Sequence, residues 1–221
     1  MSVELGYWGI KGLAEVSRLT LKLAGVDFTE YNPESPQAWG ERKASGEFEY
    51  PNLPFINVDG FKLTESGAIP WFVAKKFKPS LAGNTIEEEA QVQQVIGVIG
   101  DLKTELFKAM FTPDYKAALI AAAAADGKIA TKLNHLKHAL GDGHYLVGGH
   151  LTLADVTLAY FASVFHSVFE SAEAECPFTH HATLLAHEQN VWSQPELVEY
   201  VASAHWKKPI MPPTMVPWLK F

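Results

Sequence analysis

The chain contains 221 residues, 48% of them hydrophobic, which fits one large or two small globular domains. Its formal net charge of −7 argues against an extensive nucleic-acid interface. The only cysteine, Cys176, has no partner for an intramolecular disulfide, which indicates a reducing compartment. We recognise neither a signal peptide nor an apolar run of membrane-spanning length, so we expect a soluble cytoplasmic protein without a membrane partner.

The first part of the chain predicts short strands alternating with helices. Residues 3–7 alternate between apolar and polar or small positions, as a strand does, and apolar residues recur at helical spacing over 13–23. Gly25 suits a helix C-cap, and residues 28–31 suit a second strand. Residues 32–52 are rich in Pro, Ser, Gly and Glu, and we expect a long irregular connection there.

A hairpin and a further helix are predicted next. Two apolar runs in residues 54–63 flank Asp59 and Gly60, a pair that favours the positive φ angles of tight turns. Ser66 is a suitable N-cap for the helix that follows. The order is therefore β-α-β, a connection, and β-β-α within residues 1–80.

Beyond residue 85 the pattern is almost entirely helical. Residues 78–85 are typical of a linker, and the strand pattern nearly disappears after them. We therefore predict one domain in residues 1–80 and a second, all-helical domain in residues 86–221. The helices expected in the second domain span residues 86–111, 115–140, 152–170, 181–192 and 195–206.

Residues 148–156, GGHLTLADV, predict the start of a core helix. Thr152 as N-cap and Asp155 three residues later match a capping box, with Asp in place of the usual Glu or Gln. The Pro-rich tail, residues 207–221, is too apolar for a solvated segment, so we expect it to pack on the body of the protein.

Three motifs in this order resemble those of the glutathione transferases. Residues 6–18, GYWGIKGLAEVSR, resemble the opening of the mu and sigma classes, and residues 50–69 resemble the glutathione-binding hairpin with its Leu-Pro and Glu-Ser pairs. Residues 148–156 resemble the capping box of the family. The chain thus resembles a cytosolic glutathione transferase, mu-like or sigma-like. The resemblance implies an N-terminal thioredoxin-like domain followed by an all-helical C-terminal domain.

Tyr7 matches the catalytic tyrosine of this family. Glutathione carries a cysteine thiol whose ordinary pKa is about 8.5, so the thiol is mostly protonated at neutral pH. A tyrosine hydroxyl is protonated there and can donate a hydrogen bond to the thiolate, which lowers the thiol pKa. From the pattern alone, a buried aromatic residue that ends a strand is the simpler interpretation of Tyr7.

The resemblance also implies a set of glutathione-binding residues. Leu53, before a cis proline, would pair with the cysteinyl unit, Glu65 and Ser66 would hold the γ-glutamyl end, and Trp39 and Lys43 the glycyl carboxylate. Asp101 would reach the site of a neighbouring subunit in a homodimer, with Tyr50 as an interface aromatic. The full set is Tyr7, Trp8, Leu13, Trp39, Lys43, Asn52, Leu53, Pro54, Glu65, Ser66 and Asp101.

The expected second substrate is a hydrophobic electrophile, so its pocket should be apolar. Phe111 stands near the place of a second tyrosine in mu-class enzymes, whereas the GLAE motif with Glu15 and Arg18 leans toward the sigma class. The class therefore stays open at this point. The residues expected to form the pocket are Ile10, Leu13, Met110, Phe111 and Trp218.

No metal is expected. The spacing of His180, His181 and His187 matches no standard ligand set, and we expect surface histidines. Cys176 does not stand at the strand-to-helix junction used by thiol-disulfide enzymes of this fold. The predicted activity is conjugation of glutathione to electrophiles. The alternatives are a non-catalytic binding or structural relative, and a glutathione-dependent isomerase of the prostaglandin synthase type.

Overall fold

The computed structural model describes residues 1–220, and Phe221, at the end of the predicted tail, lies outside the described residues. The N-terminal part is built on a four-stranded sheet with the order β2-β1-β3-β4. β1 pairs with β2 in parallel and with β3 antiparallel, and β3 and β4 form the predicted hairpin. This mixed sheet is thioredoxin-like. Its strands are β1 (Val3–Gly6), β2 (Thr29–Tyr31), β3 (Phe55–Val58) and β4 (Phe61–Thr64).

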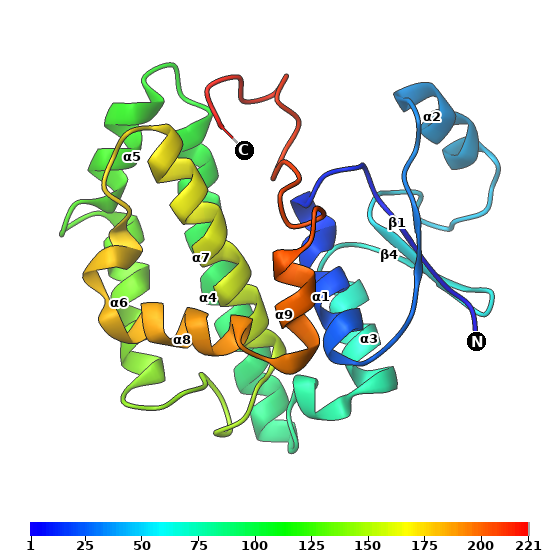
Figure 1. Cartoon of the computed structure of the whole chain (residues 1–221), viewed down its shortest axis with the longest axis horizontal. Coiled ribbons are helices and arrows are strands. Elements are labelled where there is room, and N and C mark those ends of the chain that lie inside the picture. The colour runs from blue at the N-terminus through cyan, green and yellow to red at the C-terminus, as the bar shows by residue number, and fades with distance from the viewer. Residues whose placement is uncertain (221) are drawn as a thin grey trace.

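Two helices, α1 (Glu15–Leu23) and α3 (Ala68–Phe77), lie between the sheet and the helical part of the chain (Figure 1). α1 is apolar on two faces because it serves two cores. Leu21 packs with the sheet residues, whereas Leu19 belongs to the core of the helical part. A single helix thus joins both parts of the molecule. Short 3₁₀ turns precede α1 (Gly12–Ala14) and follow α3 (Pro79–Ala82).

The rest of the chain is helical, with α4 and α7 packed against each other at its centre (Figure 1). Leu102 of α4 and Phe165 of α7 are fully buried in this core. A 3₁₀ turn, Pro177–His180, precedes α8. The helices are α4 (Ile86–Met110), α5 (Tyr115–Ala123), α6 (Lys128–Leu140), α7 (Leu153–Ser171), α8 (Ala182–Trp192) and α9 (Pro195–Ala202).

The prediction of one helix over residues 115–140 was wrong, because α5 ends at Ala123 and α6 begins at Lys128. Gly127 lies in the break, and a Cβ atom at this position would be 2.3 Å from the carbonyl oxygen of Ala122. Only glycine lets the two backbone segments approach so closely. The last predicted helix is also shorter than expected, since α9 ends at Ala202.

The irregular connection predicted for residues 32–52 contains a helix, α2 (Pro36–Ala44). Ser35 caps it, since its hydroxyl oxygen accepts a hydrogen bond from the amide of Ala38. Ser66 is not the N-cap of α3, which begins at Ala68 with Gly67 in the cap position.

The predicted capping box is present at the start of α7. The buried Asp155 carboxylate accepts hydrogen bonds from the amides of Thr152 and Leu146, each at 2.8 Å. His187 is not a surface histidine, because only 2% of it is exposed and its Nε2 lies 2.9 Å from Asp155. The capping residue therefore also anchors α8 to α7.

The C-terminal tail packs on the body as predicted. The amide of Lys11 donates to the carbonyl of Pro209 at 2.8 Å, and the amide of Gly12 donates to that of Ile210 at 3.0 Å. Val216 is buried. Within residues 1–220, no helix has the length and apolar character needed to cross a membrane.

Candidate active site

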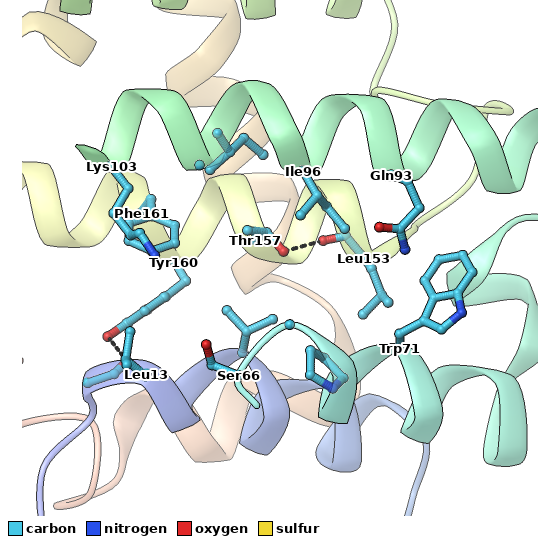
Figure 2. Close-up of a pocket in the computed structure, with 16 residues that line it drawn as sticks. Leu13, Ser66, Trp71, Gln93, Ile96, Lys103, Leu153, Thr157, Tyr160 and Phe161 are labelled. Carbon is cyan, nitrogen blue, oxygen red and sulfur yellow. Dashed lines mark hydrogen bonds between the residues drawn. The ribbon is translucent and has the colours of Figure 1, made fainter. Parts of the chain in front are cut away.

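A cavity of about 240 Å³ opens between α1, α3, α4 and α7 (Figure 2). Its walls come from both parts of the chain, and most of the side chains are apolar. Its apolar groups include Leu13, Trp71, Ile96 and Phe161. Such an apolar cleft with a few polar groups is typical of a small-molecule site. The polar side chains that line it are Ser66, Gln93, Lys103, Thr157 and Tyr160.

Tyr7 follows directly after β1. Its amide donates to the carbonyl of Tyr31 at 3.0 Å, which continues the strand pairing by one residue. Its hydroxyl oxygen accepts a hydrogen bond from the amide of Leu13 at 3.1 Å. Tyr7 is not among the residues that line the cavity, but its hydroxyl contacts Leu13, which is.

The Tyr7 phenol keeps its proton at neutral pH. Burial raises its pKa above the ordinary value of 10.0, and this effect outweighs the opposing hydrogen bond from Leu13 and the charge of Arg18. The oxygen accepts from Leu13, but within residues 1–220 its own proton has no acceptor. The hydroxyl is therefore able to donate to a further group.

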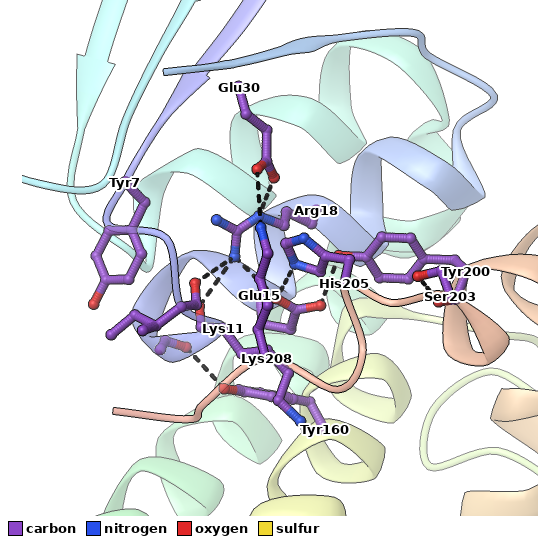
Figure 3. Close-up of polar contacts among 12 residues, drawn as sticks. Tyr7, Lys11, Glu15, Arg18, Glu30, Tyr160, Tyr200, Ser203, His205 and Lys208 are labelled. Carbon is purple, nitrogen blue, oxygen red and sulfur yellow. Dashed lines mark hydrogen bonds and ion pairs between the residues drawn. The ribbon is translucent and has the colours of Figure 1, made fainter. Parts of the chain in front are cut away.

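The loop beside Tyr7 is held by a buried arginine (Figure 3). Arg18, on α1, is 1% exposed, and its Nη1 donates to the carbonyls of Ile10 and Lys11 at 3.1 Å each. The hydroxyl of Tyr160 donates to the carbonyl of Gly12 at 2.9 Å. Three successive carbonyls of the loop are therefore fixed by buried donors.

Arg18 belongs to a cluster that connects the two parts of the chain (Figure 3). Glu15 lies 2.9 Å from its Nη1 and also accepts from the hydroxyl of Tyr200 at 2.7 Å. His205 Nε2 lies 3.3 Å from the same carboxylate. Burial acts to raise the pKa of Glu15, but the hydrogen bond from His205 and the charge of Arg18 outweigh it, so the pKa is lowered.

A second set of contacts surrounds the bond between Leu53 and Pro54, which is cis. The side-chain amide of Asn52 donates to Glu65 at 3.0 Å, and its oxygen accepts from the amide of Leu53 at 2.9 Å. Glu65 has a φ of 79°, and Ser66 after it lines the cavity. Asn52 thus ties the residue before the proline to the segment that enters α3.

The sequence matches two family models. One, the N-terminal domain of glutathione S-transferase, covers residues 3–75, and the other, the C-terminal domain, covers residues 100–204. A 26 kDa class-mu glutathione S-transferase isozyme of Fasciola hepatica is 31% identical over 159 residues, 70% of each chain. The chain belongs to the glutathione S-transferase family.

This glutathione S-transferase is mu-like, and it belongs to a family of transferase enzymes. The human glutathione S-transferase Mu 4 is 29% identical over 177 residues, which are 77% of this chain and 78% of the relative. A glutathione S-transferase of the hookworm Necator americanus, described as monomeric, superposes with a TM-score of 0.71. It has 29% identity and covers 92% of this chain and 98% of its own.

Several residues predicted for the glutathione site, and Ile10 of the predicted electrophile pocket, gather around Tyr7. Trp8, Ile10 and Trp39 pack against an apolar cluster that includes Tyr7 and Leu53. Lys43 shares α2 with Trp39 and is exposed.

Asp101, predicted to reach a neighbouring subunit's site, and Tyr50, predicted as an interface aromatic, are not part of this cluster. Asp101 pairs with Lys132 at 2.6 Å and does not line the cavity. Tyr50 is 70% exposed.

Of the five residues expected to surround the electrophile, only Leu13 lines the cavity. Met110 is buried in the helical core, and Phe111 is 51% exposed. Trp218 stacks on Tyr115 with 3.9 Å between ring centroids. The apolar walls come instead from α3, α4 and α7, which the sequence pattern marks only as helices with buried faces.

Proposed function

We propose that this transferase conjugates reduced glutathione to hydrophobic electrophiles, and that Tyr7 stabilises the thiolate. The observation that carries the proposal is the Tyr7 hydroxyl, which keeps its proton, donates to no acceptor within residues 1–220 and contacts Leu13, a residue of the apolar cavity. Hydrogen bonds to a charged group contribute about 1.5–3 kcal/mol. This is sufficient to move the thiol pKa from about 8.5 to the physiological range.

The reaction needs no group other than the two substrates. The thiol proton passes to solvent, and the thiolate attacks the electrophilic carbon. A carbon–sulfur bond forms, and the leaving group, chloride in a chloronitrobenzene, departs with the bonding electron pair. The apolar walls of the cavity favour a hydrophobic second substrate.

We infer that the peptide lies along the Leu53–Pro54 segment, with its γ-glutamyl end toward Glu65 and Ser66. The Leu53 amide is engaged by Asn52, so pairing with the cysteinyl unit requires the Asn52 side chain to release it. Trp39 and Lys43 are proposed for the glycyl carboxylate.

We also propose that the protein acts in the cytoplasm as a homodimer. Tyr50 would lie at the subunit interface, and Asp101 would lie near the neighbouring site. The exposure of both side chains is compatible with this role.

Replacement of Tyr7 by Phe tests the proposal. We expect the kcat/KM for a chloronitrobenzene at neutral pH to fall roughly 10- to 100-fold, because the hydrogen bond to the thiolate is lost. Tyr31→Phe is the matched control, since Tyr31 packs on Phe55 in the same region with a centroid distance of 5.9 Å. An unchanged rate in Tyr7→Phe would contradict the role of Tyr7. Retention on a glutathione resin without turnover of any electrophile would favour a binding protein.

A further inference from the structure

The wall of the cavity formed by α4 carries one charged side chain, Lys103. Among the residues that line the cavity, no other residue is ionised at neutral pH. Lys103 Nζ lies 5.9 Å from the ring centroid of Phe161, which faces the cavity from α7. Figure 2 shows the lysine reaching from α4 toward Phe161 and Tyr160, across the cavity from Ser66.

The Lys103 ammonium group has no carboxylate partner within 4.0 Å in residues 1–220. The acidic residues nearest to it on α4 are engaged elsewhere. Asp101 pairs with Lys132 at 2.6 Å, and Glu105 pairs with Lys108 at 2.9 Å. A cation beside apolar groups and without a counter-ion attracts an anion more strongly than one in free solvent does.

The same wall has room for a ligand beside this lysine. Gly100 lies three residues earlier on α4, so it shares a face with Lys103 and also lines the cavity. A Cβ atom added at Gly100 would meet no atom within 4 Å. The surface of α4 one turn before Lys103 is therefore open toward the cavity.

We propose that the cavity selects aromatic electrophiles that carry a carboxylate, with Lys103 as the residue that binds the carboxylate. The apolar walls would hold the aromatic body, and the lysine would pair with the acid on the wall opposite Ser66. This inference rests on the proposed function and names the substrate class of the same site. Lys103 acts here as a specificity-determining residue and has no role in forming the thiolate.

An aryl enone with a carboxylate and the methyl ester of the same enone form a matched substrate pair. In both, the glutathione thiol adds across the carbon–carbon double bond. The sulfur bonds to the β-carbon. The α-carbon takes up one proton, which balances the proton that the thiol lost, so no other reactant is consumed. The two compounds differ only in the charge that the lysine would recognise.

The variants to compare are Lys103→Gln, Lys103→Arg and, as a control, Lys108→Gln on the same helix, whose exposed lysine pairs with Glu105 outside the cavity. For Lys103→Gln we expect the kcat/KM of the acid to fall about tenfold, since a hydrogen-bonded charge pair is lost. The kcat/KM of the ester should stay the same in Lys103→Gln. Lys103→Arg should keep the preference for the acid, and Lys108→Gln should leave the kcat/KM of both substrates unchanged.

An equal fall in the kcat/KM of the acid and of the ester in Lys103→Gln, or a rise in the KM for glutathione, would overturn the proposal. Either result would assign Lys103 to glutathione binding or to the fold. A binding measurement separates this outcome from failure of the proposed function. The saturated analogues of the acid and the ester, which cannot react, are titrated while tryptophan fluorescence is followed, since Trp71 lines the cavity.

If the wild-type protein conjugates neither enone but binds the saturated acid about tenfold more tightly than Lys103→Gln does, conjugation fails and the carboxylate site stands. Equal affinity of both proteins for the acid would overturn the site, whatever the enzymatic rates.

Discussion

Tyr7 is held in place by its nearest neighbours, and Gly12 is the most restrictive of them. Gly12 has a φ of 47°, and a Cβ atom there would lie 2.6 Å from a ring carbon of Tyr7 and 2.7 Å from its hydroxyl oxygen. Any side chain at this position has to displace the phenol. The absence of a side chain at residue 12 is thus as important for the Tyr7 hydroxyl as the hydrogen bond from Leu13.

Gly12→Ala is expected to damage both stability and activity. The strained φ costs about 1 kcal/mol, and the displacement of the ring adds to it. The kcat/KM for a chloronitrobenzene should also fall, because the Tyr7 hydroxyl moves with the displaced ring. Gly25→Ala is the control, because Gly25 has a φ of 65° but its added Cβ would meet no atom within 4 Å. Urea denaturation should show a loss of about 1 kcal/mol in Gly25→Ala and a larger loss in Gly12→Ala. Only Gly12→Ala should lose activity. Full activity of Gly12→Ala would contradict the close packing of the ring.

At the scale of elements, α1 positions the loop that follows β1. Arg18 bonds two carbonyls of that loop as well as Glu15, and its Nε lies 2.5 Å from Glu30 on β2. Removing one partner of a buried ion pair costs about 3–5 kcal/mol, because the other charge is left without compensation.

We expect Arg18→Met to lose about this amount of unfolding free energy. Arg42→Met is the control. Arg42 is also bonded to two carboxylates, those of Glu4 and Glu47, but its side chain is 20% exposed, so its loss should cost about 1 kcal/mol. Equal losses, measured by urea denaturation, would show that the buried cluster contributes no more than a partly exposed one.

Local sequence signals were sufficient to predict some of the elements. The Asp59-Gly60 turn and the Thr152 capping box depend on residues within four positions of each other, and both were predicted. α2 was missed because none of its residues is buried, so it has no apolar period to detect. The break between α5 and α6 was missed because an Ala-rich stretch favours a helix throughout.

The cluster around Arg18 could be predicted only in part. Glu15 and Arg18 stand three residues apart on one helix face, so their spacing alone predicts an ion pair. Tyr200 and His205 follow about 185 residues later, and nothing in their local pattern indicates Glu15 as a partner. The walls of the cavity are non-local in the same way, which explains why only Leu13 was placed there.

At the scale of the whole molecule, this cluster makes stability depend on pH. Glu15 has a lowered pKa in the folded protein, so its contribution is complete above the ordinary carboxyl pKa of 4.5 and is lost as the pH falls through the folded value. Tyr200 behaves in the opposite way. Burial and the nearby Glu15 raise its pKa, so its contribution is present below the ordinary value of 10.0 and is lost as the pH rises above it.

The free energy of unfolding, measured by urea denaturation across the pH range, should therefore be highest between the ordinary pKa values of 4.5 and 10.0. Glu15→Gln should flatten the acid side of the curve, and Tyr200→Phe should flatten the alkaline side. Both variants should be less stable than the wild type at neutral pH. Tyr200→Phe loses one buried hydrogen bond, worth about 1 kcal/mol, whereas Glu15→Gln should lose about 3–5 kcal/mol, because the buried charge of Arg18 loses a partner. Parallel curves for the variants and the wild type would show that other groups control the pH dependence.

The proposed role of the Tyr7 hydroxyl is to stabilise the thiolate of bound glutathione. It is tested most directly by titrating that thiolate through its ultraviolet absorbance in the complexes of the wild-type and Tyr7→Phe proteins. We expect the bound thiol to have a pKa at least one unit below its ordinary value of about 8.5 in the wild type, and close to that value in Tyr7→Phe. The same pKa in both complexes would contradict the claim.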